Sequence, residues 1–170
     1  MRLLLPLLLI PISIAACQSD TVDRMQLEGE PVSFAELKGY TSTTERNATV
    51  FTSTRSNKDA SSIVIRTVRM DERSDRTPEE IVRATQASLE AMPKASVSTP
   101  TSVDDAYLEA MQFDVSFEPR TKPGKTYERR HVVLFGDDYA FHVLHTAPKG
   151  RMGDLAKDFR RVVETLREES

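Results

Sequence analysis

The second half of the chain carries the feature that most constrains the fold, a strict alternation of apolar and polar side chains. Between Met111 and Phe117 every second residue is apolar, and the residues between them are Gln112, Asp114 and Ser116. Neighbouring side chains of a β-strand point to opposite faces, so this pattern predicts a strand with one buried and one solvated face. The segment therefore predicts a sheet that is wet on one side.

Two pairs of further runs predict hairpins. Residues 126–135 and 139–147 are rich in β-branched and aromatic side chains, and Gly136-Asp137-Asp138 separates them. Residues 47–54 and 61–70 have a similar composition, and turn-forming residues lie between them. Both pairs are expected to be antiparallel, whereas the rest of the segment from Val32 to Arg55 carries only a weak signal.

A helix is predicted over residues 78–92, where the apolar spacing changes to a helical period. Thr77 is a good N-cap, Pro78 suits the first helical position, and the two glutamates that follow favour the positive end of the helix dipole. Pro93 ends the helix, because proline cannot continue the hydrogen-bond ladder.

A second amphipathic helix is predicted from about 154 to 168, and its apolar stripe is expected to pack on the sheet. The stripe consists of Leu155, Phe159, Val162, Val163 and Leu166. Strands joined by hairpins, with one helix inserted and one terminal, predict an α+β fold with a mostly antiparallel β-sheet.

The order of these elements resembles the PsbP/DcrB-like superfamily over roughly residues 61–167. The resemblance rests on the strand pair, the helix with an acidic start, the Gly136-Asp137-Asp138 turn, the Thr-Ala-Pro at 146–148 and the closing helix. The chain has no tryptophan, whereas the family often carries an aromatic Pro-Trp segment in its N-terminal half. The resemblance implies an extrinsic subunit, a chaperone-like adaptor or a partner-binding domain.

The N-terminus has the layout of a secretory signal. Arg2 precedes an apolar run from Leu3 to Ile14, which is too short to span a bilayer of roughly 30 Å and ends in small residues. The residues Ile14-Ala15-Ala16-Cys17 resemble the lipobox of bacterial lipoproteins. That resemblance implies removal of residues 1–16, attachment of a diacylglycerol to the Cys17 thiol, and acylation of the freed amine by a fatty acid such as palmitate.

Two or more acyl chains would hold the protein stably at a membrane. The expected organisation is a signal peptide at 1–16, an acylated Cys17 with a flexible spacer to residue 31, and a single domain over 32–170. In bacterial lipoproteins the residue after the cysteine influences sorting, and with Gln18 at that position the resemblance implies the outer membrane, with the domain facing the periplasm. The alternative is an ordinary signal cut after Ala15, which would leave the only cysteine of the chain as a free thiol.

Composition argues against nucleic-acid binding. The formal net charge is −3, and aromatic residues make up 6% of the chain. Nucleic-acid binders usually present a basic face, often with aromatic stacking platforms. The partners we expect are therefore the membrane, through the acyl chains on Cys17, and an envelope protein.

All three histidines fall in the second predicted hairpin. If Gly136 and Asp137 form a two-residue loop, His131 and His142 lie directly opposite each other on one face, and His145 lies on the other. Two histidines do not complete a zinc site, and only Asp114 suggests itself as a third ligand. We predict no metal and no cofactor.

Three other groups deserve a functional interpretation beside a structural one. The pair Asp137 and Asp138 would serve acid–base chemistry, but carboxylates in a tight turn usually shape the turn. Residues 149–153 resemble a phosphate loop, but they lack the P-loop spacing and are expected to be a linker. Six arginines could gather into a basic patch or lie as ordinary solvated positions: Arg66, Arg69, Arg129, Arg130, Arg160 and Arg161.

No catalytic residue is predicted, because no nucleophile motif occurs. The function expected is that of a non-enzymatic, lipid-anchored binding or accessory module of the cell envelope. One alternative is a metal-dependent or hydrolytic envelope enzyme that uses the hairpin of His131 and His142. Another is a carrier of a small ligand or lipid, with a pocket between sheet and helix.

Overall fold

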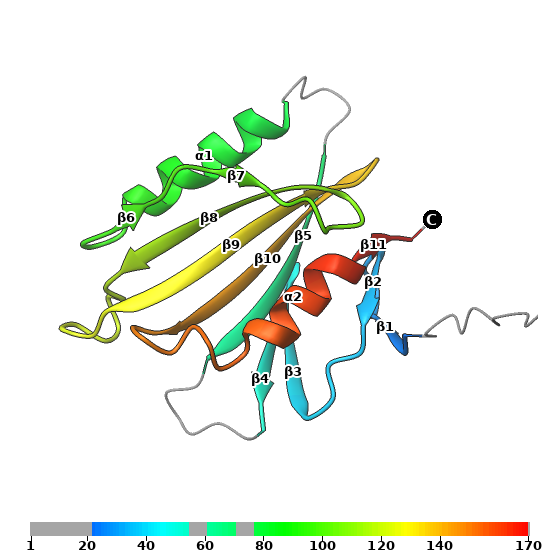
Figure 1. Cartoon of the computed structure of the whole chain (residues 1–170), viewed down its shortest axis with the longest axis horizontal. Helices are drawn as coiled ribbons and strands as arrows, with labels where there is room; N and C mark the ends of the chain where they lie inside the picture. Colours follow the sequence, from blue (N-terminus) through cyan, green and yellow to red (C-terminus); the bar gives the residue numbers. More distant parts are fainter. Residues whose placement is uncertain (1–21, 55–60, 71–76, 170) are drawn as a thin grey trace, which may run out of the picture.

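The computed structural model describes residues 22–54, 61–70 and 77–169, and its centre is a twisted antiparallel sheet of eight strands (Figure 1). The strand order is β3-β4-β5-β10-β9-β8-β6, and β7 also pairs with β8. The strands are β3 (Tyr40–Glu45), β4 (Ala48–Ser53), β5 (Ser62–Arg69), β6 (Ser96–Val97), β7 (Thr101–Ser102), β8 (Glu109–Phe117), β9 (Tyr127–Phe135) and β10 (Tyr139–Pro148).

Each face of the large sheet packs against a different helix. Helix α2 (Ala156–Thr165) and a small sheet cover one face, and helix α1 (Pro78–Glu90) covers part of the other. The small sheet has the order β1-β2-β11, with β1 (Arg24–Gln26), β2 (Val32–Ala35) and β11 (Arg167–Glu168). The two faces bury separate apolar clusters, so the sheet divides the core into two layers. The α+β fold with an inserted and a terminal helix is confirmed.

The predicted alternation in β8 sets the division between the layers. Phe113, Val115 and Phe117 are buried on the face that meets α1, whereas Asp114 is exposed on the other face. Both predicted hairpins are present, since β4 pairs antiparallel with β5 and β9 with β10. Strand β3, in the segment with a weak signal, forms one edge of the sheet and has mostly exposed side chains.

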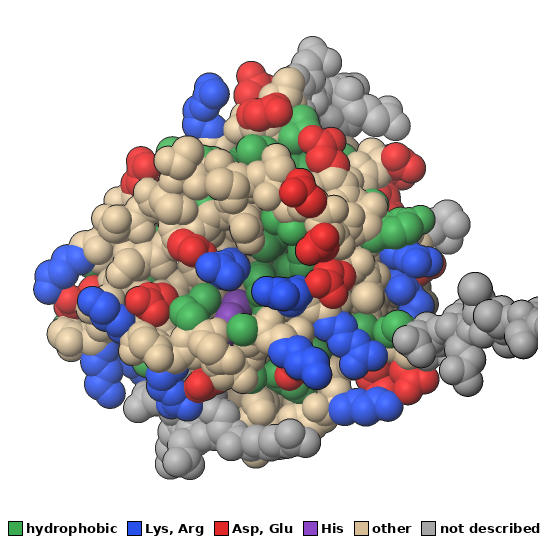
Figure 2. All heavy atoms as spheres, viewed as in Figure 1, with side chains coloured by type: hydrophobic (Ala, Val, Ile, Leu, Met, Phe, Trp, Pro, Cys, Tyr) green, Lys and Arg blue, Asp and Glu red, His purple; other side chains and the backbone are tan. Residues whose placement is uncertain are grey.

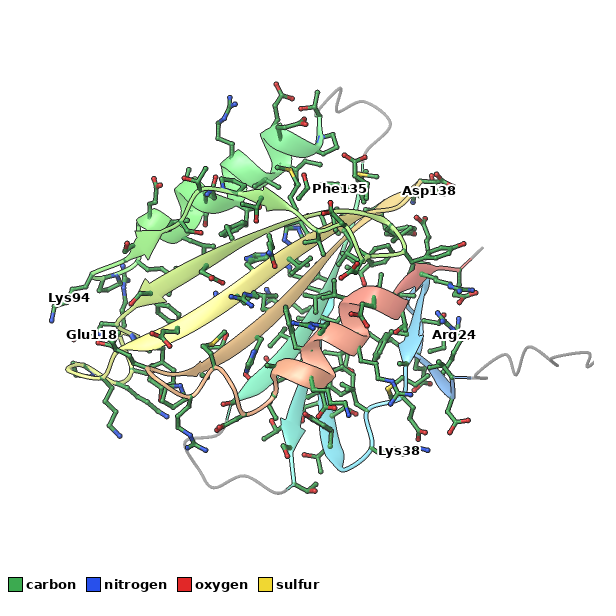
Figure 3. The ribbon with its side chains drawn as sticks, viewed as in Figure 1. Arg24, Lys38, Lys94, Glu118, Phe135 and Asp138 are labelled. Atoms are coloured by element: carbon green, nitrogen blue, oxygen red, sulfur yellow. The ribbon has the colours of Figure 1, made fainter. Side chains whose placement is uncertain are left out.

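Helix α1 begins as the sequence predicts. The Thr77 side chain accepts a hydrogen bond from the Glu80 N–H, and the Glu80 carboxylate accepts one from the Thr77 N–H, which completes a capping box. The helix ends at Glu90, two residues earlier than predicted, with Ala91 as its C-cap. Beyond it, the ammonium group of Lys94 pairs with the Glu118 carboxylate at 2.6 Å, at the end of β8 (Figure 3).

The C-terminal helix is shorter than the predicted range of 154–168. It ends at Thr165, because Leu166 turns into an extended conformation and is fully buried in the core. Arg167 and Glu168 then pair with β2 as strand β11. The edge of β2 offers backbone partners that a solvated last helical turn would not have, and this tertiary contact overrides the helical pattern.

Part of the predicted spacer has a regular structure. Residues Arg24–Gln26, within the range 17–31, form strand β1 on the other edge of β2. The predicted signal peptide, the lipobox and Cys17 lie outside the described residues. Among the residues that are described, no helix is long and apolar enough to cross a membrane.

Candidate functional site

A groove opens between α2 and the large sheet, and we call it the α2 groove. Its volume is about 390 Å³, within the range of sites that hold small organic ligands. Figure 2 shows the hollow on this face, with hydrophobic and histidine side chains at its bottom and charged side chains around it. It is lined by Ser102, Val103, Asp104, Asp105, Gln112, Arg130, Val132, His145, Met152, Ala156, Phe159, Arg160, Val163 and Glu164.

Three parts of the chain build the groove. Strands β8, β9 and β10 supply its floor, α2 supplies one wall, and the segment after β7 supplies the other. That segment crosses the β8 edge of the sheet, since Val103, Ala106 and Leu108 pack against the same apolar cluster as α2. These apolar residues hold the segment on the same face of the sheet as α2. The groove is the space that remains between the segment and α2.

His145 is the buried polar residue of the floor. Its side chain is 1% exposed, and its ring lies 5.6 Å from that of Phe159. Nε2 is buried and has no hydrogen-bond partner within the described part of the chain. Burial lowers the pKa of His145, the positive charge of Arg130 lowers it further, and Asp154 opposes the shift. The imidazole is therefore neutral at neutral pH, with one nitrogen able to donate and the other able to accept.

The charges around the groove are unequally paired. The Arg130 guanidinium donates two hydrogen bonds to the Asp114 carboxylate, at 2.9 and 3.0 Å, so these two charges offset each other. The other charged lining residues form no ion pair with a described residue: Asp104, Asp105, Arg160 and Glu164. Apart from the pair of Arg130 and Asp114, the groove therefore has three carboxylates and one guanidinium, that of Arg160, and its net charge is negative.

The other two histidines, His131 and His142, lie on the opposite face of the sheet and contact each other. His131 Nε2 lies 2.9 Å from His142 Nδ1, a hydrogen-bonding distance. The His131 ring also packs on the Phe113 ring, with centroids 4.9 Å apart, while its Nδ1 has no partner among described atoms. Burial is the main reason why the pKa of His131 falls to about 3 and that of His142 to about 4.

The register of the hairpin corrects one prediction about these histidines. The two-residue loop is Asp137-Asp138, not Gly136-Asp137, because the Gly136 N–H bonds to the Tyr139 carbonyl. His131 therefore faces Leu144, and His142 is its diagonal neighbour instead of lying directly opposite. The two share one face and His145 lies on the other, as strand alternation predicts.

The prediction that Asp114 is the nearest candidate for a third metal ligand beside these histidines is wrong. Phe113 lies opposite His131, so Asp114 points to the other face, where it pairs with Arg130. In the described ranges, no group of three or more histidine, cysteine, aspartate or glutamate side chains could hold a metal ion. The pair of imidazoles alone does not make up the three or four protein ligands of a zinc site.

The acidic pair at the hairpin turn has structural contacts. Asp137 and Asp138 are both exposed, and the Asp138 N–H donates to the carboxylate of Glu168 in β11. Phe135 and Asp138 mark this end of the sheet in Figure 3. The turn therefore ties the hairpin to the small sheet.

Residues 149–153 lie in the connection between β10 and α2, as a linker would. The Gly150 N–H donates to the Glu128 carboxylate, and Arg151 forms an ion pair with Asp154 at 2.6 Å. Helix α2 begins without a side-chain cap. These contacts give the segment a structural role.

The six arginines do not gather into one patch. Register places Arg66 and Arg129 on the α1 face and Arg69 and Arg130 on the α2 face. The guanidinium of Arg129 lies over the Phe117 ring, 4.9 Å from its centroid, and donates to Thr146 Oγ1. Arg160 and Arg161 are exposed on α2. The interpretation as separate strand and helix positions therefore fits the structure.

The sequence suggested a pocket between sheet and helix only as an alternative, and it did not identify which residues line this groove. Its outer wall comes from residues 102–105, which lie in a segment without a clear helical or strand period. The one signal available was Val103-Asp104-Asp105-Ala106, where two adjacent carboxylates lie between apolar residues. Only the path of the segment over the sheet edge shows that these carboxylates border a cavity.

Comparisons with known proteins identify the fold. No family model matches the sequence, and no curated protein matches it significantly. Among solved structures, LpqN, involved in cell envelope biogenesis of Mycobacterium tuberculosis, is similar with a TM-score of 0.59 and 14% identity, covering 90% of this chain and 88% of that one. Cyanobacterial PsbP (CyanoP) from Synechocystis gives a TM-score of 0.58 and 9% identity, covering 91% and 98%.

Two further structures extend this likeness. The Ran-binding protein Mog1p of Saccharomyces cerevisiae has a TM-score of 0.56 and 10% identity, and the match covers 86% of this chain and 94% of that one. A Bacteroides thetaiotaomicron protein matches with a TM-score of 0.58 and 13% identity over 82% of this chain, which spans only 46% of that protein. At these identities the likeness concerns the fold alone: the fold of this chain is similar to that of cyanobacterial PsbP.

Proposed function

We propose that this protein is a non-enzymatic binding or accessory module, tethered to the cell envelope by acyl chains on Cys17, and that the α2 groove is its binding site. The observation that carries the proposal is a cavity of about 390 Å³ whose lining includes His145, a buried residue whose Nε2 has no hydrogen-bond partner among the described residues. A buried polar group without a partner costs about 1–3 kcal/mol. The lining of the groove combines apolar side chains with many polar and charged ones, and convergent polar groups in a concave site favour ligand binding.

The similar structures support binding at the envelope by analogy of fold. LpqN is involved in cell envelope biogenesis, and Mog1p is a Ran-binding protein. The lipobox-like sequence before Cys17 supports a tether to the outer membrane, with the domain facing the periplasm. Residues 18–23 would then separate the lipid from strand β1.

Partner binding at the groove is tested by photocrosslinking in intact membranes. A photoreactive amino acid at position 105 lies at the groove, and the same amino acid at position 43 lies on the exposed edge strand β3. We expect a specific crosslinked species from position 105 and none from position 43. Equal crosslinking from both positions would contradict the groove as the binding site.

The tether is tested separately. Cys17→Ser is expected to abolish acylation and to leave the signal peptide uncut by the lipoprotein peptidase, whereas Ser19→Ala, next to the lipobox, should change neither. Mass spectrometry of the mature wild-type protein should find a diacylglycerol and an amide-linked acyl chain on Cys17. A mature protein that begins at Ala16 and carries an unmodified thiol would show that ordinary signal cleavage occurs instead.

A metal-dependent or hydrolytic enzyme is the competing function, since the structure brings His131 and His142 into contact. Elemental analysis of the purified wild type distinguishes the two. Stoichiometric metal that is lost in His131→Ala but kept in His145→Ala would favour the enzyme. We expect no stoichiometric metal in either case, because two imidazoles that bond to each other at 2.9 Å do not make up the three or four protein ligands of a zinc site.

A further inference from the structure

The chemistry of the α2 groove indicates which class of ligand it takes, and this inference rests on the groove being a binding site. The groove combines apolar surface with polar groups at its floor and borders. Val103, Val132, Phe159 and Val163 supply apolar side chains from both walls and the floor. A ligand that fills this space therefore needs an apolar body.

The charged groups that remain available are mostly anionic. The guanidinium of Arg130 is engaged by Asp114 in a two-point hydrogen bond, so it is not free to receive an anion. Asp104 and Asp105 on one wall and Glu164 on the other then stand against Arg160 alone. Electrostatic complementarity favours a cation between the walls.

His145 fits the same preference. Its neutral imidazole offers a lone pair, and Nε2 has no partner in the described structure. A protonated histidine would repel a cation, whereas burial lowers the pKa of His145 and keeps this imidazole neutral. Carboxylates and a neutral imidazole together form a set of acceptors, which an ammonium group with its several N–H donors can satisfy.

We infer that the α2 groove binds a small organic cation, an amine with an apolar body, whose ammonium group lies between the carboxylates of the two walls. The apolar body packs against Phe159 and Val163, and the acceptors receive the N–H groups. Since part of the attraction comes from exposed carboxylates, affinity should fall as salt rises.

Three probes of matched size test the inference on the purified protein: phenylbutylamine, phenylbutyrate and phenylbutanol. Binding is measured by calorimetry, and the imidazole ¹⁵N shifts of His145 report whether the probe occupies the groove. We expect the amine to bind and to move the His145 signals while those of His142, on the other face, stay unchanged. Equal or tighter binding of phenylbutyrate or phenylbutanol would overturn the inference.

Charge-matched variants separate a local from a general effect. Asp104→Asn with Asp105→Asn removes two carboxylates at the groove, and Asp137→Asn with Asp138→Asn removes two at the distant hairpin turn. We expect the first pair to weaken amine binding about three- to tenfold at low salt, as for a few exposed charge pairs, and the second to have little effect. Equal weakening by both pairs, or by neither, would overturn the inference.

The outcomes also distinguish this inference from the proposed function. Crosslinking from position 105 without amine binding would leave the groove as a binding site with a ligand of other charge. Amine binding without crosslinking would support a small-molecule carrier instead of a partner-binding module.

Discussion

The two faces of the large sheet treat buried histidines differently. On the α1 face, His131 and His142 bond to each other at 2.9 Å, and Phe113 packs on the His131 ring. On the α2 face, His145 lines a groove. His131 Nδ1 and His145 Nε2 are both buried without a hydrogen-bond partner among the described residues. All three histidines come from one hairpin, so the strand alternation alone decides which face receives each. The comparison shows that the two faces differ in packing: an aromatic ring covers His131, whereas His145 borders a cavity.

The helices that cover the two faces are also held by different means. Helix α2 buries Phe159, Val162 and Val163, but it begins without a side-chain cap. Helix α1 buries only Val82, and a capping box stabilises its first turn. Tertiary packing therefore holds α2, whereas local interactions contribute more to α1.

The largest expected effect compares the same truncation in the two layers. Leu166, at the end of α2, is 0% exposed, whereas Leu89 in α1 is only half-buried. Leu166→Ala should lower the free energy of unfolding by about 3–5 kcal/mol, and Leu89→Ala by roughly 1–2 kcal/mol. Urea denaturation of both variants measures the difference. Equal losses would mean that the α1 layer contributes as much to stability as the α2 layer.

The buried pair of His131 and His142 predicts that the free energy of unfolding falls as the pH is lowered. The folded pKa of His131 is about 3 and that of His142 about 4, both below the usual 6.5, so the unfolded chain takes up protons first as pH falls. The stabilisation that these two neutral imidazoles give is fully present above pH 6.5, and it is lost as the pH falls toward the folded pKa values of about 4 and about 3. Between pH 6.5 and 5 we expect a loss of roughly 1.6 kcal/mol from each histidine, because both folded pKa values lie below this window and proton uptake by the unfolded chain sets the slope.

Urea denaturation at several pH values measures this loss, and the variant His131→Leu should show a shallower pH dependence. If that variant does not fold, the imidazole ¹⁵N shifts of the wild type give the same answer. Histidine signals of His131 and His142 that titrate near pH 6.5 in the folded protein would refute the prediction.

The smallest effect concerns the capping box of α1. Thr77→Ala removes the side chain that accepts from the Glu80 N–H, and it should cost about 1 kcal/mol, the usual value of an N-cap. Thr77→Ser keeps the acceptor and is the matched control. A loss below a few tenths of a kcal/mol in the urea transition of Thr77→Ala would show that packing of Val82, not the cap, holds this helix.

Local patterns predicted most of the strands and the start of α1. The alternation in β8 and the cap at Thr77 depend on neighbours within a few residues, so they can be read directly. The segment that forms β2 and β3 carries only a weak strand signal. Strand β2 has four residues and is fully buried, so its side chains show no alternation of apolar and polar types. The end of α2 was misjudged because β2, about 130 residues earlier, supplies the partner of β11.

By itself the sequence determined the fold class, the order of the hairpins and the face on which each histidine lies, because strand period and turn residues act locally. It also carries the lipobox-like signal before Cys17, on which the proposed tether rests. Tertiary structure alone decided the hairpin register, the pairing of Asp114 with Arg130 and the groove at His145. A cavity arises where distant segments fail to close over a sheet, and no local pattern encodes that gap.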